Sequence, residues 1–249
     1  MTDEFSGQIV LVTGAAQGIG QAIARAFPGA LVWATDIDGA AVEALAADMG
    51  GRAAMLDVSD EAAVEALMAR IVAENGRLDV LVHCAGGVRG QIGRPIETVP
   101  EADWHAILAV NATGAFLLAK HAAPVMKRQR FGRIVTIASG AGLRPSLTGI
   151  QAYTAAKHAL VGLTKQLAQE LGPHGITVNA VAPGFVRSNP TTERQWESYG
   201  PDGQQRLVES IFTRRLGTPD DIAWAVRFFA PEQSGWITGQ VLSVDGGRA

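Results

Sequence analysis

The chain has 249 residues, of which 47% are hydrophobic and 18% are charged, and its formal net charge is −3. This composition provides enough apolar side chains for a core and argues against an intrinsically disordered chain. Because there is no run of Lys or Arg, the charge pattern of a nucleic-acid-binding protein is missing.

The residue counts disfavour two further classes. The single cysteine, Cys84, excludes an intrachain disulfide and a zinc site made of cysteines, and the five histidines show no tight ligand spacing. We therefore expect no protein-built metal site. The acidic residues 1–7 lack the apolar segment of a signal peptide, and nowhere do about 18 apolar residues follow one another. We expect a cytoplasmic protein without a membrane span.

Short β-branched runs alternate with helical stretches along the whole chain. The runs that predict strands lie at residues 9–13, 31–34, 80–83, 133–137, 177–181 and 241–244. Strands that alternate with helices are typical of βαβ units in a parallel sheet, and continuous apolar runs indicate that helices cover both faces. We expect an α/β fold, a Rossmann-type doubly wound parallel sheet that forms a single domain over residues 1–249.

The first predicted strand leads into a glycine-rich loop, Gly14-x3-Gly18-x-Gly20, and then into a helical pattern that stops at Pro28-Gly29. Glycines let the backbone turn tightly and approach a pyrophosphate, and a helix N-terminus offers N–H groups without partners. Between a strand and a helix, this loop predicts a dinucleotide site.

Asp36 ends the second predicted strand, where the adenosine ribose of a dinucleotide would lie. Its carboxylate can accept hydrogen bonds from both ribose hydroxyls and would repel a 2′-phosphate. No Lys or Arg stands at Gln17 or Ile37 to bind such a phosphate. These residues favour NAD over NADP. The alternative is that Asp36 only caps the helix that begins near Asp38.

Candidate catalytic residues follow in the middle of the chain. Ser139 follows the run at 133–137, and Tyr153 and Lys157 are four residues apart, so they share one face of a predicted helix. Oxidation of a secondary alcohol requires a base for the hydroxyl proton, and a phenol with a pKa of about 10 must have its pKa lowered to serve at neutral pH. The Lys157 ammonium, with the positive charge of a nicotinamide, would lower it. Ser139 can hold the substrate oxygen, and Asn111 can connect Lys157 to water.

One segment departs from the regular alternation. From about residue 188 to 215 the chain is polar, and the next helix opens only at Thr218-Pro219-Asp220-Asp221. A long insertion at the carboxyl edge of the sheet predicts a substrate lid. Within it, Trp196 and Tyr199 either pack on a substrate ring or anchor the lid to the body.

Several arginines fall in loops predicted at the same edge. They are Arg89, Arg94, Arg144, Arg187 and Arg194. A guanidinium group binds a carboxylate, phosphate or sulfonate as a fork, so our hypothesis is an anionic substrate held by Arg89, Arg144 and Arg187. The alternative is that these arginines are solvated or paired with acids such as Glu97 and Glu193.

Together these motifs resemble the short-chain dehydrogenase/reductase family over essentially the whole chain. The matching residues are Thr13-Gly14-x3-Gly18-Ile19-Gly20, Asp57-Val58, Ala85-Gly86, Asn111, Ser139, Tyr153-x3-Lys157, Asn179 and Pro183-Gly184. The resemblance implies a catalytic tetrad of Asn111, Ser139, Tyr153 and Lys157. It also implies that Asp57 and Val58 hold the adenine, that Lys157 binds the nicotinamide ribose, and that residues 183–188 bind the nicotinamide amide.

The predicted cofactor site combines the glycine loop, Asp36 and these implied contacts. It comprises Gly14, Gln17, Gly18, Ile19, Gly20, Asp36, Asp57, Val58, Ala85, Gly86, Tyr153, Lys157, Pro183, Gly184, Val186 and Ser188. One departure is His83-Cys84, because many members of the family have two Asn there. We expect His83 and Cys84 to be buried at a strand end, the alternative being a redox or ligand role.

The sequence thus predicts an NAD-dependent oxidoreductase that interconverts a secondary alcohol and a ketone. One alternative is an NADPH-dependent enzyme similar to the 3-oxoacyl-carrier-protein reductases, and another is a dinucleotide-binding sensor without turnover. The helix around Tyr153 has small or apolar residues on more than one face. The resemblance also implies a homotetramer. We therefore expect a homotetramer or homodimer in which the helix around Tyr153 contacts another subunit, and the helix at 104–120 is a second candidate for this contact.

Overall fold

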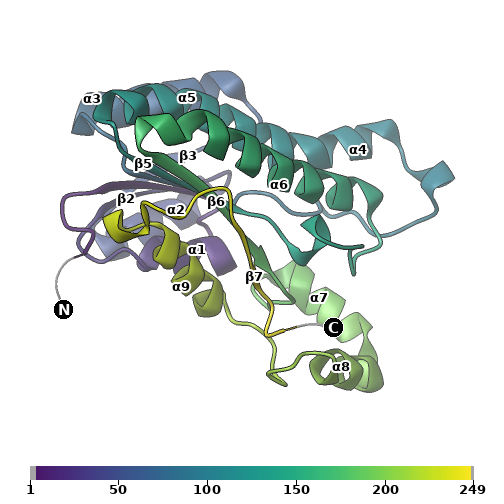
Figure 1. The fold of residues 1–249 in the computed structure, drawn as a ribbon. Coiled ribbons are helices and arrows are strands. Elements are labelled where there is room, and N and C mark those ends of the chain that lie inside the picture. The colour runs from purple at the N-terminus through teal and green to yellow at the C-terminus, as the bar shows by residue number, and fades with distance from the viewer. Residues whose placement is uncertain (1–3, 248–249) are drawn as a thin grey trace.

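Seven strands form one parallel sheet in the computed structural model, which describes residues 4–247 (Figure 1). They are β1 (Ile9–Thr13), β2 (Leu31–Asp36), β3 (Arg52–Met55), β4 (Val80–His83), β5 (Gly132–Ile137), β6 (Ile176–Pro183) and β7 (Val241–Val244). The spatial order is β3-β2-β1-β4-β5-β6-β7. The first three strands extend the sheet to one side of β1 and the last four extend it to the other side, so the strand order reverses between β1 and β4. In such sheets ligands bind outside the carboxyl ends of the strands at this reversal.

Helices cover both faces of the sheet, as the continuous apolar runs predict (Figure 1). One face carries α1 (Gly18–Arg25), α2 (Gly39–Met49) and α9 (Pro219–Phe229), and the other carries α3 (Glu61–Asn75), α5 (Gly114–Gln129) and α6 (Gln151–Leu171), with α4 (Glu101–Leu108) packed on α6. Short 3₁₀ turns lie at Ile96–Thr98, Gly140–Gly142, Gly172–His174 and Glu232–Ser234.

The central strand β1 shows why these runs are apolar throughout. Successive side chains of a strand point to opposite faces. Ile9 and Leu11 belong to the core under α3 and α5, whereas Val10 and Val12 belong to the core under α1 and α9. Both faces of the strand are therefore buried, and neither can be polar.

Helices α9 and α3 begin at residues whose side chains cap them. The Thr218 side chain accepts a hydrogen bond from the backbone N–H of Asp221, whose side chain binds the backbone of Thr218 in return, so the predicted start of α9 is confirmed. Asp60 caps α3 in the same way, by accepting from two backbone N–H groups of its first turn. Such caps satisfy donors that the helix itself leaves without partners.

A continuous helical stretch joins α4 and α5 through a π-helical turn, Ala109–Thr113. The 29 residues from Glu101 to Gln129 are long and apolar enough to cross a membrane by length and composition, although the sequence contains no uninterrupted apolar run of that length. Half of the most apolar window is buried within the fold. One such helix is weak evidence for a membrane span.

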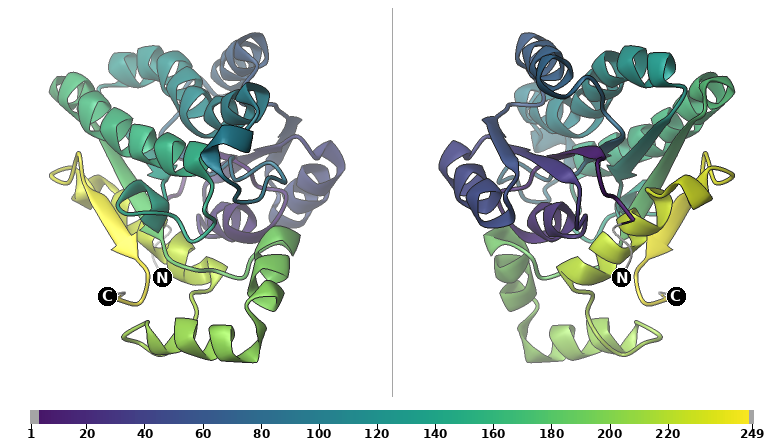
Figure 2. Two further views of the ribbon diagram at one scale, coloured as in Figure 1. Left: turned by 90° about the vertical axis from the view of Figure 1, so that its right-hand side faces the viewer. Right: turned by 90° about the vertical axis from the view of Figure 1, so that its left-hand side faces the viewer.

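The polar insertion at 188–215 is largely helical. It forms α7 (Pro190–Ser198) and α8 (Gly200–Glu209), which project beyond the carboxyl end of the sheet (Figure 2). Its position at this edge agrees with the place that the sequence predicts for a lid, and its function as a lid stays a prediction.

Candidate active site

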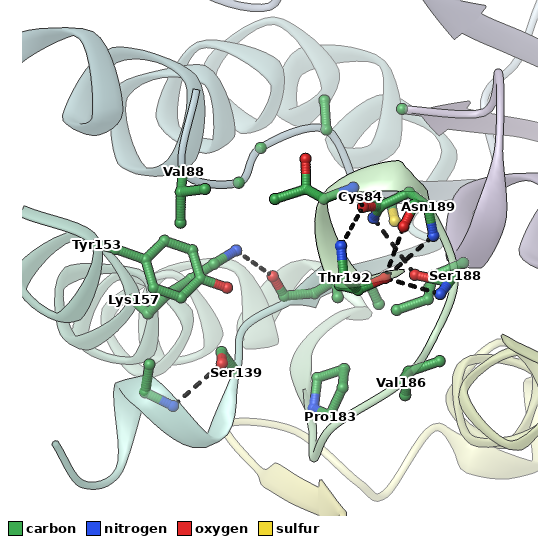
Figure 3. A pocket seen from close by; sticks show the side chains of 18 of the residues that line it. Cys84, Val88, Ser139, Tyr153, Lys157, Pro183, Val186, Ser188, Asn189 and Thr192 are labelled. Carbon is green, nitrogen blue, oxygen red and sulfur yellow. Dashed lines mark hydrogen bonds between the residues drawn. The ribbon is translucent and has the colours of Figure 1, made fainter. Parts of the chain in front are cut away.

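A cleft runs along the carboxyl ends of the central strands. It encloses about 510 Å³, and its walls include the glycine loop after β1, the ends of β2, β4, β5 and β6, the start of α6 and the first turn of α7. The catalytic candidates Tyr153, Lys157 and Ser139 lie on one side, and residues 183–189 lie on the other (Figure 3). Segments far apart in sequence thus meet in one cavity.

The glycine loop is built as a phosphate cradle requires. Gly14 and Gly18 have φ angles of +69° and +55°, which residues with a Cβ rarely adopt. A Cβ on Gly20 would lie 1.9 Å from the carbonyl oxygen of Gly14, so helix α1 can approach the loop only with glycine there. Gln17, the N-cap of α1, makes no side-chain cap. The N-terminus of α1 is therefore open toward the cleft, and the site fits a dinucleotide's pyrophosphate.

The carboxylate of Asp36 lies in the cleft at the end of β2. It accepts hydrogen bonds from the backbone N–H groups of Ala16 and Asp38, each at 3.2 Å. The capping of α2 is done by Asp38, which accepts from Ala41. The alternative reading of Asp36 as the helix cap is therefore wrong, and its carboxylate is held in the cleft wall at the end of β2.

Tyr153 and Lys157 lie one turn apart on α6, as their spacing predicts. The Nζ atom of Lys157 lies 5.7 Å from the centre of the Tyr153 ring and donates a hydrogen bond of 2.8 Å to the backbone oxygen of Ile137 at the end of β5. Ser139 follows β5 and accepts a hydrogen bond from the backbone N–H of Ala141. The end of β5 therefore positions Lys157, and the 3₁₀ turn that follows holds Ser139 next to the phenol.

Burial is the largest influence on the pKa values of Tyr153 and Lys157. It raises the pKa of Tyr153, and the hydrogen bond with Ser139 opposes this rise. Burial also lowers the pKa of Lys157 to about 8. Loss of hydration thus disfavours the Tyr153 phenolate more than Ser139 favours it, and the lowering of this pKa by Lys157 together with a nicotinamide's positive charge stays a prediction.

Asn111 lies behind the cleft, on the π-helical turn between α4 and α5, and it is fully buried. Its side-chain amide is paired with one residue of the loop after β4: Nδ2 donates to the backbone oxygen of Gly87 at 2.9 Å, and Oδ1 accepts from the Gly87 N–H at 3.0 Å. Asn111 therefore fixes the loop that forms the cleft wall beside Lys157, and its part in catalysis stays a prediction.

Nearly all the other predicted cofactor residues line the cleft. They are Gly14, Gln17, Ile19, Gly20, Asp57, Val58, Ala85, Gly86, Pro183, Gly184, Val186 and Ser188. Gly18 lies directly behind them, since a Cβ there would be 2.3 Å from the carbonyl oxygen of Ser188. Asp57 is held by hydrogen bonds from the hydroxyl and N–H of Ser59, which lower its pKa.

The predicted substrate residues divide into two groups. Arg89 and Arg144 line the cleft, and Arg144 forms an ion pair of 3.1 Å with Asp245. Arg187 instead donates to both carboxylate oxygens of Glu193 and lies over the Trp196 ring, and neither Arg187 nor Trp196 is part of the cleft wall. The alternative of loop arginines paired with acids thus describes Arg187, Arg94, which pairs with Asp103, and also Arg144, although Arg144 still lines the cleft.

Several wall residues were not singled out from the sequence. They include Val88, Thr148, Phe185, Asn189, Thr192 and Gln195. Asn189 and Thr192 form a capping box at the start of α7, and the Asn-Pro-x-Thr pattern could have predicted that helix. Phe185 packs on Trp196 and Tyr199 at ring distances of 6.1 and 5.9 Å, a grouping with no sequence signal.

Comparison with known proteins gives matches along nearly the full chain. Residues 14–249 match a family model described as enoyl-(acyl carrier protein) reductase. An uncharacterized oxidoreductase of Thermotoga maritima is 39% identical over 252 residues, covering 98% of each chain. The 3-oxoacyl-[acyl-carrier-protein] reductase FabG of Escherichia coli is 38% identical over 248 residues, with the same coverage. The crystal structure of levodione reductase matches with a TM-score of 0.90 and 30% identity over 98% of both chains.

Proposed function

The chain belongs to the short-chain dehydrogenase/reductase family, and from this premise we propose that it is an NAD-dependent dehydrogenase that interconverts a secondary alcohol and a ketone. The family makes it an oxidoreductase that acts on alcohol or keto groups. The choice of NAD, the roles of individual residues and the substrate class are our proposals. The observation that supports them best is one cleft in which Tyr153, Lys157 and Ser139 face the same cavity as the Asp36 carboxylate.

In the oxidation direction, the Ser139 hydroxyl holds the substrate oxygen beside Tyr153. Tyr153, as the phenolate, takes the proton of the alcohol while the carbon loses a hydride. The hydride acceptor in this reaction is the nicotinamide ring of NAD when it is bound. The Lys157 ammonium stabilises the phenolate. In the reverse direction, Tyr153 gives its proton to the ketone oxygen.

Asp36 supports NAD as the cofactor. The 2′-phosphate of NADP would be repelled by its carboxylate. Gln17 and Ile37, which also line the cleft, offer no positive charge to bind that phosphate. The NADPH-dependent reductase remains the second candidate, because a 3-oxoacyl-[acyl-carrier-protein] reductase is among the relatives. The two candidates differ in the cofactor that supports turnover.

We extend the substrate proposal to an anionic group near Arg144 and Arg89, the two predicted arginines in the cleft wall. A carboxylate or phosphate at Arg144 would share its guanidinium with Asp245. A cytoplasmic location is also a proposal, supported by the bacterial relatives.

The first test measures NADH formation with NAD and NADPH formation with NADP on neutral polyols, hydroxy acids, phosphorylated or sulfonated alcohols and cyclic alcohols. We expect turnover with NAD. Tyr153→Phe should abolish turnover and leave NAD affinity within about twofold, since the change removes the hydroxyl that acts on the proton and keeps the ring that lines the cleft. Turnover by the Phe variant would contradict the mechanism, and tight NAD binding without turnover on any alcohol would favour the sensor.

Two lysine variants on α6 distinguish loss of the ammonium in the cleft from a general effect of the substitution on folding. Lys157→Met should lose activity by about 100-fold or more, because the buried ammonium faces the phenol. Lys165→Met, at an exposed position two turns further along the same helix, should behave as the wild type.

A further inference from the structure

His83 ends β4 and is buried, with 1% of its surface exposed. Both ring nitrogens have partners on different elements. Nδ1 lies 3.2 Å from the Thr13 hydroxyl at the end of β1, and Nε2 lies 3.3 Å from the backbone oxygen of Asn111 on the π-helical turn. One side chain thus connects two central strands with the turn that carries Asn111.

The partners determine which nitrogen carries the proton. The Asn111 oxygen is a carbonyl and can only accept, so Nε2 must be the donor. Nδ1 of a neutral ring is then an acceptor, and the Thr13 hydroxyl donates to it. That hydroxyl has two acceptor positions left, and it accepts the backbone N–H groups of Cys84 and Ala85, each at 3.2 Å. Every group in this network is therefore satisfied by the neutral ring with hydrogen on Nε2.

Asn111, whose backbone oxygen is bonded to His83, also contacts the loop in the cleft wall. Its amide binds both backbone groups of Gly87, and its Oδ1 would lie 2.5 Å from a Cβ on Gly86. The same Cβ would be 3.7 Å from the Nζ of Lys157. The side chain of Asn111 and the ammonium of Lys157 thus both lie close to Gly86, and a shift of the π-helical turn would move the cleft wall next to the ammonium.

We propose that His83 is a positioning residue for the reaction, which acts through its Nε2–H bond to the backbone of Asn111 and thereby fixes the cleft wall beside Lys157. A ring that took up a second proton would lose the acceptor for Thr13 and would place a cation near Lys157. Burial and the charge of Lys157 both oppose this, and they lower the pKa of His83 to about 3. This inference rests on the proposed dehydrogenase function for its kinetic part only.

A spectroscopic test does not depend on turnover. In protein labelled with ¹⁵N-histidine, His83 should show a protonated Nε2 and an unprotonated Nδ1, and it should not titrate between pH 5 and 9. The other four histidines serve as internal references, because all of them lie outside this network. A proton on Nδ1, or titration of His83 in this range, would overturn the network even if the enzyme is active.

Two substitutions separate the two contacts of the ring. The amide of Asn reaches about as far as Nδ1, so His83→Asn can keep the Thr13 contact and loses the Asn111 contact. The amide of Gln reaches about as far as Nε2, so His83→Gln can still donate to Asn111. We expect His83→Gln to keep a kcat within about twofold of the wild type and His83→Asn to lose roughly fivefold, the effect of one hydrogen bond between neutral groups.

A double-mutant cycle then tests whether His83 acts through Asn111. In an Asn111→Ala background the loop contact is already gone, so His83→Asn should cause no further loss of kcat, while its effect on the melting temperature should remain. Equal kcat values for the Asn and Gln variants, or a full additional loss in the Asn111→Ala background, would show that His83 only stabilises the fold. If the wild type turns over no alcohol, the dehydrogenase proposal fails, and the spectroscopic result alone decides the network.

Discussion

At the scale of single residues, the chemistry of the cleft depends on how burial and hydrogen bonds balance at Tyr153. Burial raises the pKa of its phenol, and the Ser139 hydroxyl is the neighbouring group that opposes this. A base for an alcohol proton must lose its own proton first. Ser139 therefore has two parts in the proposed reaction, since it holds the substrate oxygen and favours the phenolate.

Replacing Ser139 with Ala should reveal both parts. We expect kcat to fall by about 100-fold, as for the loss of one donor to a reacting oxygen. The rising limb of the pH profile for alcohol oxidation should also move to higher pH, because the hydrogen bond that lowers the pKa of Tyr153 is lost. The measurement is kcat/KM against pH. A lower rate with an unmoved limb would leave Ser139 with the substrate contact alone.

Asp36 and Asp38 offer a matched pair for the cofactor preference. Asp36→Ser removes the carboxylate that would face a ribose, so we expect KM for NAD to rise by about tenfold and turnover with NADP to increase, since about 1.4 kcal/mol corresponds to a factor of ten. Asp38→Asn keeps a good helix cap at the start of α2 and should change neither value. An unchanged preference in Asp36→Ser would assign the cofactor choice to other residues.

At the scale of elements, helix α7 links the insertion to the cofactor cleft. Its N-cap, Asn189, accepts hydrogen bonds from the backbone of Thr191 and Thr192, and all three residues line the cleft. The preceding residue, Ser188, touches the glycine loop at Gly18. The start of α7 is therefore stabilised at the point where the insertion contacts the cradle, and a frayed helix would disturb cofactor binding.

Two N-cap variants test this connection. Asn189→Ala and Asp60→Ala each remove a side-chain cap, worth about 1 kcal/mol, and should lower the melting temperature by roughly 2–4 °C. Only Asn189→Ala should raise KM for NAD, because α3 starts outside the cleft wall. The measurements are thermal melts and initial rates. A similar KM change in both variants would indicate a general loss of stability instead.

At the scale of the whole molecule, helix α6 keeps an uncovered strip. Its inner positions such as Ala156 and Leu160 are buried, but His158, Ala159 and Gly162 are exposed. A Cβ added to Gly162 would meet no atom within 4 Å. Small exposed residues allow a second helix to approach closely, and this supports the predicted homotetramer or homodimer with α6 in the contact.

Light scattering tests the assembly. The wild type should have two or four times the 26.1 kDa mass of the chain at micromolar concentration. Gly162→Arg should reduce this mass without loss of helical circular dichroism, because the new side chain has open space in the single chain and none against a partner helix. Lys165→Arg, at an exposed position one turn further on, is the control. A wild type of single-chain mass would contradict the prediction.

Much of the fold and of the site could be predicted from the sequence, because these features depend on local spacing. Apolar runs between helical stretches gave six of the seven strands, and β3 was missing from these runs because its Arg-Ala-Ala-Met stretch has no β-branched residue. The four-residue spacing of Tyr153 and Lys157 predicts a shared helix face, and the glycine loop after a strand predicts a phosphate cradle.

Only the tertiary structure decided which residues far apart in sequence bind one another and how far each side chain is buried from solvent. Arg187 and Arg144 look equivalent as loop arginines, but Arg187 folds onto Glu193 and Trp196 while Arg144 stays in the cleft wall. Likewise, the Tyr-x3-Lys motif carries no signal for the burial of Tyr153, which raises the pKa of its phenol. Residue types and periodicity are properties of the chain, whereas desolvation and long-range hydrogen bonds, such as those of His83, exist only once the strands and helices have packed.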